Sequence, residues 1–120
     1  MPSRNKRQYI RVDACGYALD FTPLKDKNFS RALLVNLSEC GALILTPVPL
    51  QSRDVLQVRL HGIVGSDLIG CRARVVHLAG DRVHPTHYYA GIRFHDLLEQ
   101  HKTALRAFIE GRQRHLPCSA

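Results

Sequence analysis

Short segments in which apolar and polar residues alternate dominate the second half of this sequence. In residues 55–60 every second residue is apolar, and Gln57 and Arg59 lie between them. Residues 68–77 and 88–94 repeat the pattern. A period of two is that of a β-strand with one buried face. The chain is therefore predicted to form mainly β-sheet, with the buried faces Leu56, Val58 and Leu60, then Ile69, Cys71, Ala73 and Val75, then Tyr88, Ala90, Ile92 and Phe94.

The first half of the sequence predicts three further strands. The alternation that starts at Arg11 runs through Phe21 and enters a turn-rich stretch, 22–28. Residues 29–35 read as the return strand and residues 42–45 as the next one. After residue 94 the apolar spacing becomes helical, with Asp96 and Glu99 as a capping box and Gly111 as a stop signal.

Six short strands followed by one amphipathic helix predict an all-β fold with a C-terminal helix. We expect a small six-stranded antiparallel β-barrel, with the helix packed against an open end or edge. Residues 1–120 would form a single domain. Its parts would be a flexible basic arm at 1–11, the barrel at 12–94, the helix at 96–111 and a tail at 112–120.

Composition fits one domain with an ordinary core, since 45% of the 120 residues are hydrophobic. The longest apolar runs are too short to cross a bilayer, so we expect no membrane insertion. The basic start is not followed by an unbroken apolar stretch, so it does not resemble a secretory signal. A cytoplasmic location is expected.

The four cysteines do not form a metal or disulfide pattern. They contain no CxxC pair and have no regular spacing. We expect Cys15, Cys40 and Cys71 to be small apolar strand residues and Cys118 an incidental tail thiol. His84 and His87 have no carboxylate or thiolate at ligand spacing, so no metal is expected.

Positive charge is concentrated at the start of the chain. The formal net charge is +7, and four basic residues precede the first acidic one. A basic arm of this kind suits a phosphate-bearing ligand, an anionic surface or simple solvation.

Two short motifs lie next to the predicted strands. Arg7-Gln8-Tyr9-Ile10-Arg11 is an RxxxR motif before the first strand, and Asn36-Leu37-Ser38-Glu39-Cys40-Gly41 is an NxSxxG motif between two strands. With the later Tyr89-Ala90-Gly91-Ile92-Arg93-Phe94, this order resembles the signature of the PilZ domain family. The resemblance covers the chain from Arg7 to the final helix.

The resemblance implies a receptor for the bacterial second messenger cyclic di-GMP, with no cofactor beyond that ligand. Arginine suits a ligand with two guanines and two phosphates, because its planar fork can bond guanine O6 and N7 or phosphate oxygens and can stack on a base. Arg7 and Arg11 would wrap the ligand, and the arm would become ordered as it binds. The number of bound ligands, one or a stacked pair, stays open. Lys6, just before Arg7, lies where a residue can influence that number.

The resemblance also assigns ligand contacts to Asn36, Ser38 and Gly41. Asn36 and Ser38 alternate, so an extended backbone would point both side chains to one side. Gly41 would permit a backbone conformation or a close ligand approach that a Cβ obstructs. His77 follows a valine pair where relatives often carry an aromatic residue, and it would either stack on a base or be an exposed strand-end histidine.

Other classes of function remain as alternatives. The sequence contains no phosphate-cradling glycine loop, nucleophile elbow or paired carboxylates, so no catalytic residue is assigned. A basic β-barrel that binds single-stranded nucleic acid is possible, but only tyrosines are available for stacking and there is no Trp. A third hypothesis is a PilZ domain that binds no ligand and acts only as a protein-interaction scaffold. If the chain is a receptor, an unidentified protein effector would receive its signal. That effector would act in the control of motility, exopolysaccharide or biofilm.

Overall fold

The computed structural model describes residues 11–24, 28–64, 67–80 and 86–115, with the side chains of all of these except Val64, Asp67 and 113–115. No helix in these ranges has the length and apolarity needed to cross a membrane. The elements are, in chain order, β1 (Val12–Asp13), β2 (Ala18–Pro23), β3 (Ser30–Leu37), β4 (Gly41–Thr46), β5 (Val55–Val64), β6 (Asp67–Gly80), β7 (Tyr88–His95) and α1 (Glu99–His115).

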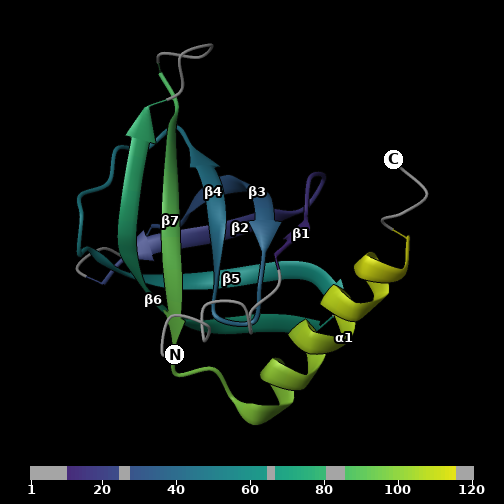
Figure 1. The fold of residues 1–120 in the computed structure, drawn as a ribbon. Helices are drawn as coiled ribbons and strands as arrows, with labels where there is room; N and C mark the ends of the chain where they lie inside the picture. Colours follow the sequence, from purple (N-terminus) through teal and green to yellow (C-terminus); the bar gives the residue numbers. More distant parts are fainter. Residues whose placement is uncertain (1–10, 25–27, 65–66, 81–85, 116–120) are drawn as a thin grey trace, which may run out of the picture.

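Six strands close into an antiparallel barrel. The order of hydrogen-bonded neighbours is β3-β2-β5-β6-β7-β4, and β4 pairs again with β3. In Figure 1 β6, β7 and β4 stand side by side at the front, while β2 and β5 cross behind them. The predicted six-stranded antiparallel barrel with one C-terminal helix is confirmed, and β1 is an additional strand on the edge of β3.

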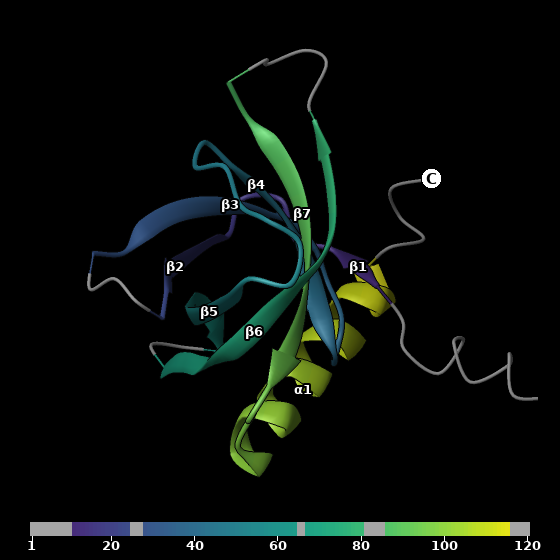
Figure 2. The ribbon, with the colours of Figure 1, turned by 90° about the vertical axis from the view of Figure 1, so that its left-hand side faces the viewer.

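The longest strand, β6, joins the front and the back of the barrel. Its first part, from Asp67 to Arg74, pairs with β5, and its second part, from Arg72 to Gly80, pairs with β7. Figure 2 shows β6 passing from one set of neighbours to the other. The register shifts between Val75 and His77, so Val76 is an extra residue opposite β7. Such a bulge bends a strand and re-aims its side chains.

The predicted first strand is interrupted by a tight turn between β1 and β2. The Asp13 carboxylate accepts a hydrogen bond from the Cys15 N–H at 3.0 Å, which is an Asx-type turn. Gly16 follows with a φ of 96°, a conformation that glycine adopts without steric cost. β1 and β2 therefore lie along the same edge of β3 as two separate strands.

This turn changes which residues face the barrel interior. Val12 and Ala14 are buried before the turn, whereas Leu19 and Phe21 are buried after it. The buried positions thus change from even to odd numbers. The sequence pattern instead predicts that Cys15 and Leu19 lie on the same face of one strand. The structure shows Cys15 exposed.

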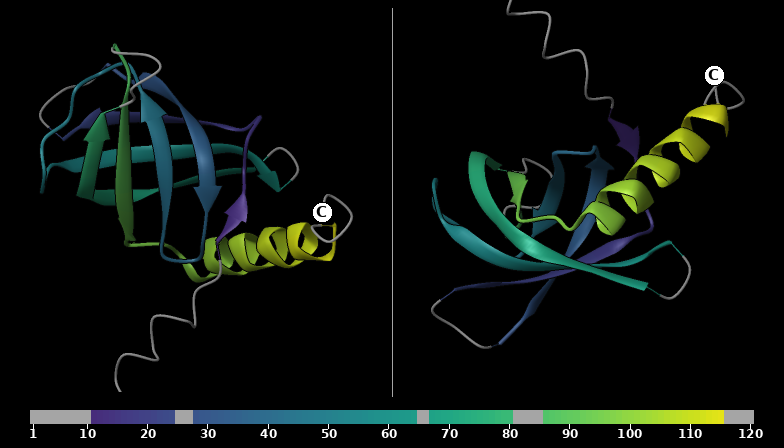
Figure 3. Two further views of the ribbon diagram at one scale, coloured as in Figure 1. Left: turned by 45° about the horizontal axis from the view of Figure 1, so that its top comes forward. Right: turned by 90° about the horizontal axis from the view of Figure 1, so that it is seen from below.

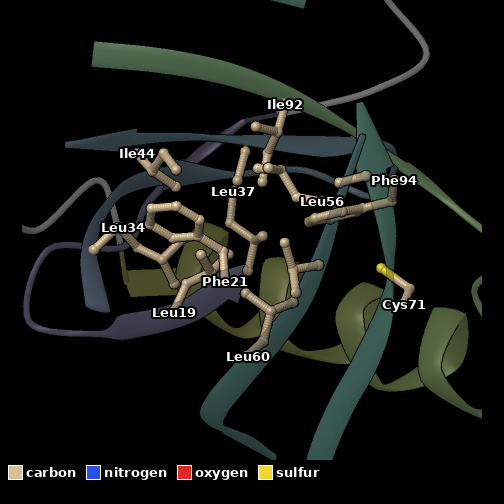
Figure 4. Packing of buried hydrophobic residues seen from close by; sticks show 14 of the residues in the cluster. Leu19, Phe21, Leu34, Leu37, Ile44, Leu56, Leu60, Cys71, Ile92 and Phe94 are labelled. Carbon is tan, nitrogen blue, oxygen red and sulfur yellow. The ribbon is translucent and has the colours of Figure 1, made fainter. Parts of the chain in front are cut away.

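One continuous apolar core fills the barrel. Figure 4 shows Phe21 lying among Leu19, Leu34 and Leu37, with Leu56 and Phe94 further along. Burying one such side chain contributes about 1.5–3 kcal/mol. All three predicted apolar faces supply the core: every residue named for residues 55–60 and 68–77 is buried, as are Ala90, Ile92 and Phe94.

Of the described cysteines, only Cys71 is a small apolar strand residue as predicted. It is buried on β6, and burial raises the pKa of its thiol to about 12. Cys40 is half-buried in a turn and Cys15 is exposed, so the prediction of strand positions for these two is wrong. Cys15 lies in the turn before Gly16, and Cys40 lies in the turn that the Ser38 hydroxyl holds together. Cys118 lies outside the described residues.

The helix α1 packs across one end of the barrel, beside β1 (Figure 3). Leu105 and Ile109 are buried against the core. Phe108 meets Tyr17 edge to face, with ring centroids 5.2 Å apart. Arg112 donates a hydrogen bond from Nε to the Asp13 carbonyl oxygen at 3.1 Å. The helix is therefore attached both to the core and to the turn after β1.

Both ends of the predicted helix differ from the structure. The capping box does not form, because the Asp96 carboxylate accepts a hydrogen bond from Arg72 and Asp96 has a φ of 62°. The helix begins three residues later, at Glu99. It also continues through Gly111 to His115. Glycine ends a helix where it adopts a left-handed conformation, and Gly111 has no positive φ.

Gly111→Ala is expected to stabilise the domain. Glycine inside a helix costs about 1 kcal/mol relative to alanine, and a Cβ at Gly111 would have open space around it. We expect the midpoint of chemical denaturation to rise, with a gain in unfolding free energy of about 0.5–1 kcal/mol. A lower midpoint would mean that Gly111 is not helical in solution.

Candidate functional site

The NxSxxG motif builds the connection from β3 to β4. Asn36 lies on β3, and the chain then turns so that Gly41 is the first residue of β4. The Ser38 hydroxyl accepts hydrogen bonds from the N–H groups of Cys40 and Gly41, at 3.3 and 3.2 Å, and lies 3.3 Å from the Gly41 carbonyl oxygen, to which it can donate. A hydroxyl has one hydrogen and two lone pairs, so this network uses its full capacity. Ser38 holds the turn together.

The expectation that an extended backbone points the side chains of Asn36 and Ser38 to one side is wrong for Ser38, which lies beyond the end of β3. Ser38 is only 1% exposed. The strand ends at Leu37, and beyond it the alternation of an extended backbone no longer applies. A ligand contact by Ser38 would require the hydroxyl to exchange one of its bonds in the turn.

Gly41 lies where two strands approach closely. A Cβ at this position would stand 2.1 Å from the carbonyl oxygen of Ile92 on β7. The backbone of Gly41 has no positive φ, so conformational freedom is not the reason for glycine here. The close neighbour that excludes a side chain is the β7 backbone.

Arg11 and Asn36 are joined by a direct contact. Arg11 Nη1 donates a hydrogen bond to Asn36 Oδ1 at 2.9 Å, across a separation of 25 residues. The Arg11 side chain is exposed, and Asn36 is half-buried on β3. The contact holds one arginine of the RxxxR motif beside the first residue of the NxSxxG motif.

A row of cross-strand partners extends from this contact over the outside of the barrel. Asp13 on β1 pairs with Asn36, Asn36 with Leu43 on β4, Leu43 with Gly91 on β7, and Gly91 with His77 on β6. We call these five residues the outer row. Three of its strands, β4, β7 and β6, stand at the front of Figure 1. Sequence reasoning missed Leu43 and Gly91. Leu43 lies in no motif, Gly91 was quoted only as part of the stretch from Tyr89 to Phe94, and the strand order that joins the two cannot be read from one sequence.

The outer row lacks a side chain at one position, Gly91, between two polar ends. Gly91 has no side chain, and a Cβ added there would come within 3.3 Å of the His77 Cβ. His77 is exposed at one end of the row, and Asn36 with Arg11 lies toward the other. With strands about 4.8 Å apart, the three spacings from β3 to β6 span roughly 14 Å. Between His77 and Leu43, the position of Gly91 carries no side chain that would keep a ligand away from the sheet.

Asp13 closes the far end of the outer row as an anion. The thiol and the N–H of Cys15 hydrogen-bond to its carboxylate and lower its pKa below the usual value. The same contact raises the pKa of the Cys15 thiol, so Cys15 is a neutral thiol at pH 7.

Glu39, in the same turn, contacts the helix rather than solvent alone. Its carboxylate accepts hydrogen bonds from Arg106 Nε and Nη2, each at 3.2 Å. Glu39, Phe94, Lys102 and Arg106 help to line an open pocket of about 550 Å³ between this turn, the end of β7 and α1. The pocket contains both acidic and basic side chains, and these are already paired.

Arg7 and Lys6 lie outside the described residues, as does His84. Of the six predicted site residues, the structure thus brings together Arg11 and Asn36 by direct contact and adds His77 through the outer row. Ser38 and Gly41 adjoin Asn36 as the turn beside it.

The family model of the PilZ domain matches residues 5–111 of the chain. The chain therefore belongs to the PilZ domain family. No curated protein sequence matches it.

Solved structures show the same fold at low sequence identity. The PilZ domain with c-di-GMP of YcgR from Escherichia coli has a TM-score of 0.72 at 18% identity, covering 92% of this chain and 94% of that one. The inhibitor of motility MotI/DgrA from Bacillus subtilis has a TM-score of 0.76 at 19% identity, covering 90% of this chain. MrkH of K. pneumonia, in complex with c-di-GMP, has a TM-score of 0.72 at 11% identity over 95% of this chain. The chain spans about half the length of the latter two, 52% and 55%.

Proposed function

We propose that this protein is a cyclic di-GMP receptor whose ligand binds over the outer row. The observation that carries the proposal is the hydrogen bond between Arg11 and Asn36, which joins the two motifs at 2.9 Å on an exposed face. Membership of the PilZ family and the fold shared with proteins solved with c-di-GMP support it.

The residues of the site suit the two parts of this ligand. The Arg11 guanidinium keeps donors beyond the one given to Asn36, and its fork can bond a phosphate or the O6 and N7 edge of guanine. The amide of Asn36 can accept from a guanine N–H or donate to a carbonyl. His77 would stack on a guanine that lies over Gly91. Ser38 and Gly41 would act chiefly by fixing the position of Asn36.

Arg7, on the N-terminal arm, would add a further contact to the ligand. The ligand would order the arm across the barrel, and the changed surface would then bind a protein partner in motility, exopolysaccharide or biofilm control, in the cytoplasm. In this role the domain transmits a signal by contact and catalyses no reaction.

Isothermal titration of the purified protein with cyclic di-GMP tests the proposal. We expect saturable binding whose stoichiometry gives one or two ligands per chain. GTP is the control for guanine recognition without the cyclic, doubly charged ring, and a short single-stranded oligonucleotide tests the nucleic-acid alternative. Neither should bind at the concentrations at which cyclic di-GMP saturates.

Two results would overturn the receptor reading. Absence of cyclic di-GMP binding would leave the family fold as a scaffold. Binding of the oligonucleotide alone would assign the basic surface to single-stranded nucleic acid, with tyrosines as the stacking residues.

A further inference from the structure

Two arginines face each other on the outside of the barrel. Arg74 on β6 and Arg93 on β7 are direct cross-strand partners, and both are exposed. Side chains that are directly opposite on one face have Cβ atoms about 5 Å apart. The strand register therefore holds two positive charges side by side.

No carboxylate in the described ranges compensates this pair. The acidic side chains on the neighbouring elements are engaged elsewhere. Asp96 accepts from Arg72, Glu39 accepts from Arg106, and Asp54 accepts from the N–H of Gln51 at 2.9 Å. Like charges directly opposite each other destabilise a sheet. Local folding gives no reason for this arrangement, whereas an anionic group bound between the two guanidinium groups would satisfy both.

The pair borders the outer row. Arg93 is the cross-strand partner of Gly41, and it lies two residues from Gly91 on the same strand, hence on the same face. From β3, which carries Asn36, β7 is two strand spacings away, or roughly 10 Å. Arg11 and the pair therefore approach one ligand-sized area from two sides.

We propose that Arg74 and Arg93 form a second phosphate subsite, which binds one phosphodiester of the cyclic dinucleotide while Arg11 binds near the other. This inference rests on the proposed function and adds two residues that neither motif contains. The ligand chemistry follows from charge: the phosphodiesters are the anionic groups of the ligand at neutral pH, and arginine forks bind phosphate oxygens in pairs.

The proposal has a separate consequence for the ligand-free protein. If the two charges are held together for a ligand, removing one should relieve repulsion in its absence. Arg74→Gln and Arg93→Gln are each expected to raise the melting temperature of the free protein by about 1–4 °C. Glutamine keeps part of the aliphatic stem, so loss of packing is small.

Titration of five proteins with cyclic di-GMP tests the subsite: wild type, Arg74→Gln, Arg93→Gln, Arg93→Lys and Arg59→Gln. Arg59 lies on β5, at the back of the barrel in Figure 1, and its substitution removes the same charge away from the outer row. We expect each glutamine variant on β6 or β7 to bind about 10-fold more weakly, with a shallower dependence of affinity on salt. Arg93→Lys should recover part of the loss, and Arg59→Gln should bind as wild type does.

The outcomes separate this inference from the proposed function. If wild type binds and the Arg74 and Arg93 variants bind equally well, the subsite is wrong and the receptor function stands. Weaker binding accompanied by a lower melting temperature of the free variants would assign the pair a structural role and would also overturn the subsite. Failure of wild type to bind would remove the proposed function, and the subsite with it.

Discussion

Gly41→Ala is expected to lower the free energy of unfolding by about 3 kcal/mol, a fall in melting temperature of roughly 10 °C. The added methyl group would stand 2.1 Å from the carbonyl oxygen of Ile92, inside van der Waals contact. A flexible side chain could rotate away from such an overlap. A backbone oxygen cannot, because β7 is paired with β4 on one side and with β6 on the other.

Thermal unfolding followed by circular dichroism measures this effect. Gly70→Ala on β6 is the matched control, since its Cβ would meet nothing closer than the Val58 carbonyl oxygen at 3.8 Å, an ordinary contact. We expect Gly70→Ala to change stability by less than about 1 kcal/mol. A Gly41→Ala protein that melts with the wild type would show that β4 and β7 are further apart in solution.

Arg11→Ala is expected to weaken cyclic di-GMP binding by about 100-fold or more, equivalent to about 2.8 kcal/mol. The substitution removes the guanidinium that would bond the ligand and leaves the Asn36 amide without the partner that orients it. Charge-assisted bonds of this kind are among the strongest single contacts to a phosphate-bearing ligand. Titration calorimetry on the wild type and the variant gives the ratio directly.

The same variant should fold normally. Arg11 is exposed, and its one hydrogen bond in the described ranges is to a side chain on the surface of β3. Exposed substitutions of this kind alter stability by no more than about 0.5 kcal/mol. An Arg11→Ala protein that melts several degrees earlier yet binds with unchanged affinity would show that the arginine is structural and would contradict its role in the site.

The strands of the second half could be predicted because each has one face in the core and one in solvent. Residues 55–60, 68–77 and 88–94 all lie within observed strands, which extend beyond each of them. The first strand could not be predicted in detail. Its interruption at Gly16 shifts the buried phase by one residue, and a continuous alternation pattern cannot represent that shift.

The candidate site was predictable only where it coincides with a motif. RxxxR and NxSxxG identify Arg11 and Asn36, and the structure joins them. The environment of Ser38 was not predictable, because its burial depends on the chain leaving β3 after Leu37. Arg93 lies in a segment that carries the family resemblance, yet its pairing with Arg74 depends on the register of β6 against β7 and on the bulge at Val76.

The outer row is assembled from positions 13 to 91, on strands that become neighbours only when the barrel is closed. A ligand bound there would therefore bind the folded chain and not the unfolded one, adding about 2.7 kcal/mol of stability at a concentration 100 times its dissociation constant. Under the proposed function, the unfolded chain would be rarer whenever cyclic di-GMP is abundant, so proteases in the cell would cleave it less often. The abundance of the receptor would then rise with its own signal, without any change in its synthesis.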